Sequence, residues 1–323
     1  MAYSGRPVSP REGFRAKRLI NIADLSDSDI AYILSLAAYY AGYLERREPA
    51  PRRLAGRTQV NLFFEDSTRT NLSFALAGSK LGADVINVPV SASSVHKGEG
   101  LIDTSQTLAA MGADVVILRT REEGLHESLE TQLPCAIING GAGASEHPTQ
   151  ALLDAVTIRA AYGEIRGLNV AICGDIKHSR VAGSNTVLLS RLGANVRFVG
   201  PANLMPNGNL FPDIERYDDL QSGLAGVDIA MALRMQFERM ADGDADSAKI
   251  KANDYFKTFG LTHQTMQYAN PNAKVMHPGP MNRGIEIDGA LADDDTVSLV
   301  LSQVFHGVAL RMACLDALIT GGL

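Results

Sequence analysis

The sequence predicts an α/β protein of two domains, each a parallel β-sheet flanked by helices. The chain has 323 residues, which exceeds the size of a typical single core. Short apolar runs alternate with helical patterns along almost its whole length, as in β-α-β units. The segment 79–85 (SKLGADV) resembles 190–196 (SRLGANV), so a helix end, a Gly and a strand start recur in both halves. These observations together indicate two similar α/β halves.

Eight short apolar runs are predicted to be strands. In chain order they are 59–64, 84–88, 114–119, 135–139, 169–173, 195–199, 228–233 and 274–276. Helical patterns separate them, so the strands of each half are expected to be parallel.

Three helices define the predicted organisation. Residues 71–81 place Phe74, Ala77, Gly78 and Leu81 on one face, at the spacing of an amphipathic helix. Residues 148–162 lie between the two halves. Residues 293–319 begin with three aspartates, which favour a helix N-terminus, and this helix is expected to pack back on the first domain. The predicted domains are therefore 1–148 plus 293–323, and 149–292, joined by interdomain helices.

The composition restricts the class of function. Hydrophobic residues make up 46% of the chain and charged residues 20%, as in ordinary globular proteins, and the net charge of -6 argues against nucleic-acid binding. No run approaches the ~20 apolar residues of a membrane span, and the basic segment 1–18 has no apolar signal-peptide core. Cys135, Cys173 and Cys314 are far apart in apolar surroundings, which suggests buried thiols and a cytoplasmic location.

The segment 63–70 (FFEDSTRT) carries the strongest functional signal. It follows a predicted strand and opens a predicted helix, so hydroxyls, backbone amides and a guanidinium come together. A helix N-terminus attracts anions, and Arg matches two phosphate oxygens at once. Ser and Thr are also common N-caps, so residues 67–70 taken alone would more often be an ordinary helix start than a ligand site.

Other polar residues follow the remaining strands, where open parallel sheets place their ligands. They are Ser93, Lys97, Arg119, His147 and Gln150 in the first half, and Arg180, Arg234, Gln236 and the turn 277–281 (HPGPM) in the second. So many cations at strand ends of an acidic protein predict a small crevice for a polyanionic substrate. The chain has no P-loop, dinucleotide fingerprint, metal-binding spacing or nucleophile elbow, so the expected chemistry uses no metal, cofactor or covalent intermediate.

Six motifs in register resemble the aspartate carbamoyltransferase family, within the aspartate/ornithine carbamoyltransferase superfamily. They are 63–70 (FFEDSTRT), 97–99 (KGE), 146–150 (EHPTQ), 174–175 (GD) with Arg180, 234–236 (RMQ) and 277–280 (HPGP). The resemblance runs over roughly residues 18–320. It implies two Rossmann-like domains and transfer of the carbamoyl group of carbamoyl phosphate to L-aspartate. The products would be N-carbamoyl-L-aspartate and phosphate, an early step of pyrimidine biosynthesis.

The resemblance also implies a role for each site residue. Carbamoyl phosphate would be bound by Ser67, Thr68, Arg69, Thr70, Arg119, His147, Gln150, Gly279 and Pro280. L-aspartate would be bound by Lys97, Arg180, Arg234 and Gln236. The residues that would act in catalysis are Arg69, Thr70, Arg119, His147 and Lys97, with Thr70, Arg119 and His147 donating to the carbonyl oxygen where charge develops.

Members of this family form catalytic trimers, so the resemblance implies that Ser93 and Lys97 enter the site from a neighbouring subunit. It leaves open whether such trimers bind regulatory or dihydroorotase-like chains. The chain departs from commoner family patterns at Asp66, Asn71, His96 and Gly100. His96 and Gly100 lie in the segment 93–100, so we expect these departures to affect the mobility of that segment and its affinity for the substrate.

Two rival functions remain. An ornithine carbamoyltransferase would share the phosphate segment, but it would carry a His-Cys-Leu-Pro turn where this chain has 277–280 (HPGP). Two arginines in the second half suit a second carboxylate better than an ammonium group. An inactive paralogue with a structural or regulatory role would have lost some of Arg69, Lys97, Arg119, His147 and Arg234, and all five are present.

Overall fold

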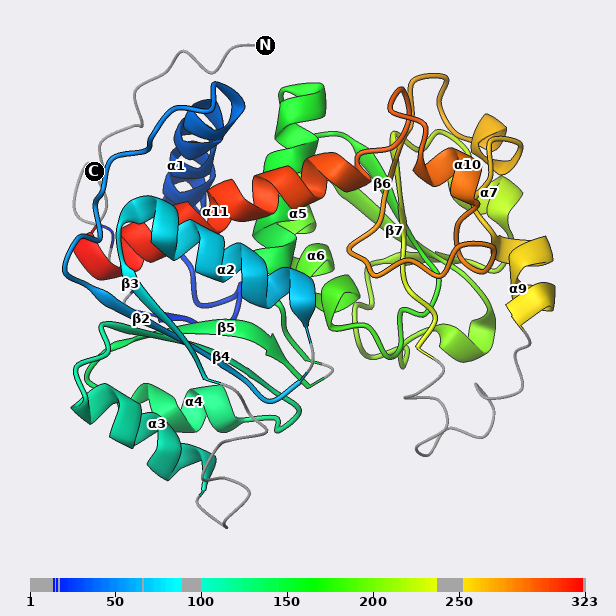
Figure 1. The fold of residues 1–323 in the computed structure, drawn as a ribbon. Helices are drawn as coiled ribbons and strands as arrows, with labels where there is room; N and C mark the ends of the chain where they lie inside the picture. Colours follow the sequence, from blue (N-terminus) through cyan, green and yellow to red (C-terminus); the bar gives the residue numbers. More distant parts are fainter. Residues whose placement is uncertain are drawn as a thin grey trace. The chain divides into compact units, whose positions relative to one another are not determined.

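The computed structural model describes residues 14, 16, 18–65, 67–88, 100–143, 145–236 and 252–321. The chain divides into two compact units, residues 1–156 with 304–323, and residues 157–303. Each unit contains one five-stranded sheet (Figure 1). The predicted fold class is therefore confirmed. The chain passes from one unit to the other inside two helices, α5 (Pro148–Tyr162) and α11 (Val300–Thr320).

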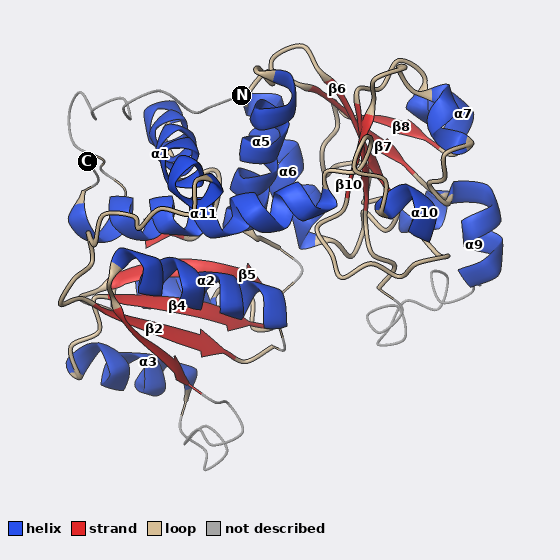
Figure 2. Cartoon of the chain, turned by 45° about the horizontal axis from the view of Figure 1, so that its top comes forward, coloured by secondary structure: helices blue, strands red, loops and turns tan. Residues whose placement is uncertain are grey.

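The sheet of the first unit has the strand order β1-β5-β4-β2-β3, and all its pairs are parallel. The strands are β1 (Arg18–Leu19), β2 (Thr58–Phe63), β3 (Asp84–Val88), β4 (Val115–Thr120) and β5 (Ala136–Ala142). Helices cover both faces of the sheet (Figure 2): α1 (Asp27–Glu45), α2 (Thr68–Leu81) and α11 on one, and α3 (Leu101–Ala110) and α4 (Leu125–Glu130) on the other.

The alternating side chains of the strands fill both layers between sheet and helices. One buried cluster joins strands β2 and β4 to helix α4. It contains Val60, Leu62, Val116, Leu118, Leu125 and Leu129. Strands buried on both faces read as nearly continuous apolar runs. The short apolar runs therefore revealed β2 and β4 in the sequence.

The sheet of the second unit has the order β10-β9-β6-β7-β8 and is also parallel throughout. Its strands are β6 (Asn169–Cys173), β7 (Asn195–Val199), β8 (Glu215–Tyr217), β9 (Ile229–Ala232) and β10 (Lys274–Met276). The helices are α6 (Arg180–Arg191), η3 (Ala202–Leu204), α7 (Leu220–Leu224), α9 (Ala252–Phe259), η5 (Thr265–Tyr268) and α10 (Gly289–Ala292).

Two predictions of secondary structure were incomplete or wrong. β1 and β8 were missed, because two and three residues are too few for a periodic pattern. The C-terminal helix begins at Val300 rather than Asp293. The carboxylate of Asp294 instead accepts hydrogen bonds from the amide of Thr296 at 2.9 Å and from the hydroxyl of Thr296 at 2.6 Å. These local hydrogen bonds stabilise a turn at the position where a helix start was predicted.

Within the described part of the chain, no helix combines the length and apolar character needed to cross a bilayer. All three cysteines are free thiols, with Cys173 and Cys314 buried and Cys135 half-buried. This agrees with the expectation of unbridged thiols.

Candidate functional site

Three loops of the first unit leave the sheet at the same edge. They follow β2, β4 and β5, which are neighbours in the parallel sheet. The Phe64 amide donates to the Arg119 carbonyl at 2.8 Å, and the Gly143 amide donates to the Thr120 carbonyl at 3.0 Å, so the strand ends lie side by side. This edge carries Ser67–Thr70, Arg119, His147 and Gln150, all predicted from the sequence as site residues.

The first turn of α2 is open to an anion. Ser67 is the N-cap residue, yet its side chain makes no capping hydrogen bond to the helix. Thr68 and Arg69 are exposed, whereas Thr70 is buried. Partial burial lowers the pKa of the Arg69 guanidinium, because it removes water from the charged form. A helix N-terminus without a side-chain cap and a partly dehydrated cation together favour phosphate.

Arg119 is held between strand β5 and the loop that follows β2. Its Nη1 donates to the Gly140 carbonyl at 3.2 Å, and its Nε lies 3.2 Å from Glu65 Oε2. The side chains of Arg119 and Glu65 are only 12% and 11% exposed. A planar guanidinium with two fixed contacts has few remaining rotamers, so its other N–H groups are already oriented.

His147 and Gln150 lie at the start of α5. The His147 carbonyl accepts from the amides of Gln150 at 3.0 Å and Ala151 at 3.3 Å, which places its imidazole at the helix N-terminus. Both side chains are buried. Gln150 Nε2 donates to Asp154 Oδ1, one helical turn later, at 3.0 Å. Asp154 was not predicted, because it lies inside a helix and outside every motif.

In the second unit, the predicted site residues also lie at one edge of the sheet. Its loops follow β6, β9 and β10, which are also neighbours in a parallel sheet. Arg180 is the first residue of α6, and the hydroxyl of Ser179 accepts from the Ala182 amide at 3.2 Å as the N-cap. Gln236 Nε2 donates to the His178 carbonyl at 3.2 Å. Arg180, Arg234 and Gln236 therefore belong to one edge of this sheet.

The loops after β6 and β9 approach each other closely at Gly174. Its φ is +125°, and a Cβ atom there would lie 3.0 Å from the Leu233 carbonyl oxygen. Only glycine adopts this conformation without strain and leaves room for the neighbouring backbone. The glycine of the GD motif therefore serves to bring the Arg234 loop against the loop that leads to Arg180.

Asp175 organises the segment between β6 and α6. It is fully buried and accepts from His178 twice, from Nδ1 at 2.8 Å and from the amide at 3.2 Å. Burial raises the pKa of this carboxyl, while the hydrogen bonds and charge of His178 oppose the shift. Asp175 is the second residue of the GD motif, and its pairing with His178 holds the backbone before Arg180.

The turn 277–280 is held by a buried histidine. The Gly279 amide donates to His277 Nδ1 at 2.7 Å, so the proton of a neutral imidazole lies on Nε2, which faces Glu286 Oε1 at 3.1 Å. Glu286 also accepts from the Asn282 amide. The backbone that carries Gly279 and Pro280 is thus anchored on both sides. Glu286 was not predicted, since it stands outside every motif.

Some predicted positions lie outside the described residues: Ser93, Lys97, Asp66 and His96. Of the other departures from the family pattern, Asn71 lies in the first turn of α2 and its amide donates to the Ser67 carbonyl at 3.0 Å. Gly100 is the N-cap residue of α3.

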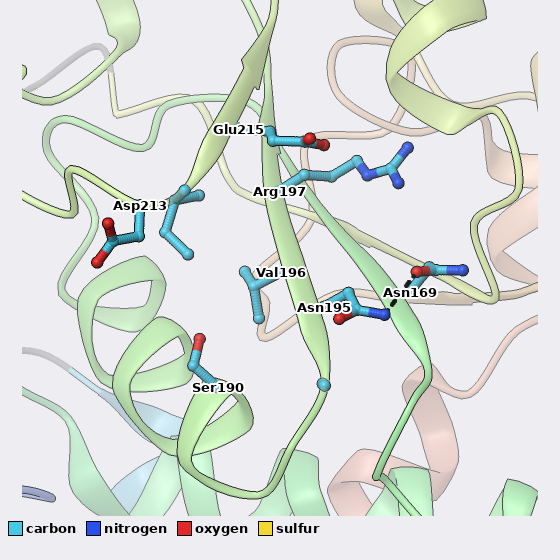
Figure 3. A pocket seen from close by; sticks show the side chains of 9 residues that line it. Asn169, Ser190, Asn195, Val196, Arg197, Asp213 and Glu215 are labelled. Atoms are coloured by element: carbon cyan, nitrogen blue, oxygen red, sulfur yellow. Dashed lines mark hydrogen bonds between the residues drawn. The ribbon is translucent and has the colours of Figure 1, made fainter.

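A cavity of about 470 Å³ lies elsewhere in the second unit, at the amino ends of β6 and β7 (Figure 3). Asn169, Asn195, Asp213 and Glu215 line it, and Asn195 Nδ2 donates to Asn169 Oδ1 at 3.1 Å. It contains none of the predicted site residues. Asp213 and Glu215 outnumber the single cation of the lining, Arg197, so the wall of the cavity does not attract a polyanion. Among the described residues no cluster of three or more His, Cys, Asp or Glu side chains is arranged to hold a metal ion.

Two family domains match the chain. Residues 17–160 match the domain described as "Aspartate/ornithine carbamoyltransferase, carbamoyl-P binding domain", and residues 166–318 match "Aspartate/ornithine carbamoyltransferase, Asp/Orn binding domain". The boundary between the two matches lies close to the boundary of the compact units at residue 156, whereas residues 304–318 match the second family domain and belong to the first compact unit.

Curated relatives show the same similarity. The chain is 52% identical over 305 residues to the aspartate carbamoyltransferase catalytic subunit of Parvibaculum lavamentivorans, covering 94% of this chain and 92% of that protein. It is 50% identical over 304 residues to that of Dinoroseobacter shibae, covering 94% and 95%.

Solved structures agree in fold. Aspartate transcarbamoylase from Trypanosoma cruzi in complex with carbamoyl phosphate and aspartate superposes with a TM-score of 0.86 at 32% identity, covering 95% of this chain and 98% of that one. The catalytic subunit of the M. Jannaschii enzyme gives 0.82 at 32% identity, covering 94% and 98%.

Proposed function

The chain belongs to the aspartate/ornithine carbamoyltransferase family, and from this premise we propose how its residues carry out the reaction. The activity is that of an aspartate carbamoyltransferase: the carbamoyl group of carbamoyl phosphate passes to the amine of L-aspartate. Half of the aligned positions are identical to catalytic subunits with that name, over more than nine-tenths of the chain.

One observation supports the proposed carbamoyl phosphate site above all others. Three adjacent parallel strands of the first unit bring the start of α2, Arg119 and His147 to a single edge. In the proposal, the amides and hydroxyls of Ser67–Thr70 and the Arg69 guanidinium bind the phosphate. Each contact to an ionised oxygen is a charge-assisted hydrogen bond, the strong kind.

The carbonyl oxygen of the substrate gains negative charge as the amine attacks. In the proposal, Thr70, Arg119 and His147 donate hydrogen bonds to it. Arg119 is already held by Gly140 and Glu65, so little reorganisation is needed during the reaction. Such preorganised donors typically contribute a factor of about 10²–10³ in rate each.

Backbone carbonyls of Gly279 and Pro280 and the side chain of Gln150 are proposed to accept hydrogen bonds from the carbamoyl nitrogen. The anchoring of this turn through His277 and Glu286 supports that role. Arg180, Arg234 and Gln236 are proposed to bind the two carboxylates of L-aspartate, because a guanidinium fork matches a carboxylate.

The amine of L-aspartate must attack as the free base. Its electron pair forms the new C–N bond, the C–O bond to phosphate breaks, and the leaving phosphate takes up the amine proton. Positioning and electrostatic stabilisation account for such a reaction without a nucleophilic side chain. The product, N-carbamoyl-L-aspartate, places the proposed reaction early in pyrimidine biosynthesis.

We extend the proposal to the assembly. Ser93 and Lys97 are proposed to act from a neighbouring subunit of a homotrimer, with Lys97 serving both L-aspartate binding and catalysis. Three free thiols fit a reducing compartment, so the proposed location is the cytoplasm.

The acceptor is the most direct test. The purified chain should carbamoylate L-aspartate and should show no comparable rate with L-ornithine at equal concentration, measured by phosphate release and by mass detection of the product. A higher rate with ornithine would overturn the assignment of the second unit's arginines to a carboxylate. Native mass measurement of the same sample gives the number of subunits, and any state other than a trimer contradicts the proposed assembly.

A further inference from the structure

A series of hydrogen bonds within the second unit connects two segments of the proposed site. One is the turn 277–280, whose backbone carbonyls contact the carbamoyl nitrogen in the proposal. The other is the loop 234–236, which carries Arg234 and Gln236. The two segments follow β10 and β9, which are paired parallel strands, so they leave the sheet side by side at the same edge.

His277 anchors the turn at one end of this series. Its Nδ1 accepts from the Gly279 amide at 2.7 Å, and its own backbone amide donates to Gln303 Oε1 at 2.9 Å. Its Nε2 lies 3.1 Å from Glu286 Oε1. A backbone N–H group can only donate, so Nδ1 is an acceptor and the proton of the neutral imidazole lies on Nε2, directed at Glu286.

Asn282 connects Glu286 to the loop 234–236. The backbone amide of Asn282 donates to Glu286 Oε1, and its side-chain Nδ2 donates to the Met235 carbonyl at 3.4 Å. Met235 is fully buried and lies between Arg234 and Gln236. This contact therefore holds the backbone to which both proposed aspartate-binding side chains are attached.

Both contacts to Glu286 use a single oxygen of a buried carboxyl group. Glu286 is 1% exposed, and its other oxygen, Oε2, has no hydrogen-bond partner among the described residues. Burying a carboxyl group with one oxygen unpaired costs stability. These observations favour a role for Glu286 in arranging the two segments over a role in stabilising the core. They also indicate that an acceptor oxygen at the position of Oε1 is the only group that this role requires.

The two segments hold the two reactants of the proposed reaction. The turn 277–280 contacts the carbamoyl group, and the loop 234–236 binds a carboxylate of L-aspartate. The distance between the segments therefore sets the distance from the carbamoyl carbon to the attacking amine. Reacting atoms must come within about 3–3.5 Å of each other, and a displacement of ~1 Å can cost about 10²-fold in rate.

We propose that His277, Glu286 and Asn282 form a brace that places the amine of the acceptor within reach of the carbamoyl carbon. The inference rests on the proposed function, which assigns one reactant to each segment. The three residues of the brace are positioning residues, because they act through the backbone of the turn and the loop. The brace contributes to the rate of the chemical step and not to the affinity for a dicarboxylate, which the arginines bind.

Succinate, the dicarboxylate that lacks the amine of L-aspartate, separates alignment from binding. The kcat and the constant for inhibition by succinate against L-aspartate are measured at saturating carbamoyl phosphate. The proteins are the wild type, Asn282→Ala, Glu286→Met and Glu286→Gln. Asn282→Ala and Glu286→Met should lower kcat by about 10–100-fold and change the succinate constant by less than about threefold. Glu286→Gln keeps an acceptor oxygen and should retain most of the kcat.

Asn270→Ala is the matched control. Asn270 is a half-buried asparagine of the same unit, and its Nδ2 donates to the Gly226 carbonyl at 3.2 Å, at the opposite ends of β9 and β10. This variant should leave both kcat and the succinate constant unchanged.

Three results would overturn the inference. The first is a kcat of Asn282→Ala equal to that of the wild type. The second is a succinate constant that weakens by the same factor as kcat falls, which a merely structural role would give. The third is a Glu286→Gln variant that loses as much kcat as Glu286→Met. A wild type that does not carbamoylate L-aspartate would instead overturn the proposed function, so the two failures are distinct.

Discussion

Arg69 shows at the scale of one residue how an anion site is prepared. It stands in the first turn of α2, and partial burial lowers the pKa of its guanidinium. The cation has lost part of its hydration, and a bound phosphate would compensate for that loss.

Replacing Arg69 therefore should impair carbamoyl phosphate more than L-aspartate. Arg69→Gln removes the charge with little change in volume, and we expect kcat/KM for carbamoyl phosphate to fall by about 10²–10⁴, as for loss of a charge-assisted contact to the reacting group. Initial rates with each substrate varied in turn provide the measurement. A carbamoyl phosphate profile equal to that of the wild type would contradict the phosphate role of Arg69.

Arg234 and Arg197 offer a matched pair within the second sheet. Both are half-buried. Arg234 follows β9 at the proposed site, whereas Arg197 lies within β7, where it donates to the Ala225 carbonyl at 3.0 Å and its guanidinium carbon lies 5.3 Å from the Tyr217 ring centre.

We expect Arg234→Ala to raise the KM of L-aspartate by about 10–100-fold, since a bidentate contact to a carboxylate is worth about 1.5–3 kcal/mol. Arg197→Ala should leave that KM unchanged. The KM values of the two variants are compared by measuring saturation curves for L-aspartate at a fixed concentration of carbamoyl phosphate. Equal effects of the two substitutions would show that Arg234 has no specific role in substrate binding.

Residue type and position in the chain were enough to suggest Arg69, Arg119, His147 and Arg234, because each follows an apolar strand. They did not suggest Asp154, Glu286 or Arg311. Asp154 and Glu286 are hydrogen-bonded to Gln150 and His277, and Arg311 is buried in α11. No local pattern distinguishes such residues from ordinary core or surface positions.

At the scale of elements, α2 depends on close contact with the sheet below it. A Cβ atom at Gly78 would overlap Gln59 Oε1 and lie 2.9 Å from Val85 Cγ2. Gln59 is fully buried and its Nε2 donates to Asn61 Oδ1 at 2.9 Å and to the Phe74 carbonyl at 3.0 Å, so it cannot move aside easily.

Gly78→Ala consequently should destabilise the protein. An Ala in a helix interior is normally favoured over Gly by roughly 1 kcal/mol, but overpacking a buried contact costs about 1–3 kcal/mol. We expect a net loss in the free energy of unfolding, measured by urea denaturation. Ser79→Ala, at the exposed neighbouring position, should change it by less than about 0.5 kcal/mol. A stabilising Gly78→Ala would show that the contact relaxes without cost.

The elements that the sequence predicted correctly are those with several turns or several buried pairs. α2, α5, β2 and β6 each carry enough apolar positions for a period to be visible. The start of α11 was predicted wrongly, because three aspartates in a row are also compatible with a turn. In the structure, hydrogen bonds from Thr296 to Asp294 stabilise the turn.

At the scale of the whole molecule, the assembly can be tested without a structure of the trimer. If Lys97 and Ser93 act across subunits, mixing Lys97→Ala and Arg69→Ala proteins should restore part of the activity, because some sites receive both native residues. Dissociation and reassociation of the mixed chains, followed by an activity assay, gives the measurement. No recovery after exchange has been confirmed by native mass would contradict shared sites.

Stability should also respond to pH through a buried histidine. Burial lowers the pKa of His306 to about 4 from its ordinary 6.5, so the unfolded chain binds a proton first as the pH falls. The free energy of unfolding therefore falls as the pH is lowered from about 6.5 to about 4. The loss due to His306 is at most roughly 3 kcal/mol, at 1.36 kcal/mol per pKa unit. Asp175, with a raised pKa, acts in the opposite direction.

The comparison of wild type with His306→Asn separates these two effects. Urea unfolding at pH 7 and at pH 4.5 should show a smaller loss of stability on acidification for the variant, because Asp175 is present in both proteins. Parallel losses in the two proteins would mean that His306 does not contribute to the pH dependence.

The sequence by itself determined the α/β class, most strands and the family, and it suggested the charged residues of the proposed site, because each of these leaves a local trace in periodicity, in turn residues or in short motifs. Only the tertiary structure decided which strands are neighbours, and hence which loops meet at one sheet edge, since β-pairing joins residues far apart in the chain. It also revealed groups that hold others in place: Glu65 beside Arg119, His277 between Gly279 and Glu286, and Asp154 beside Gln150. Their effect depends on burial and on electrostatic distance, and neither quantity is written in the order of the residues.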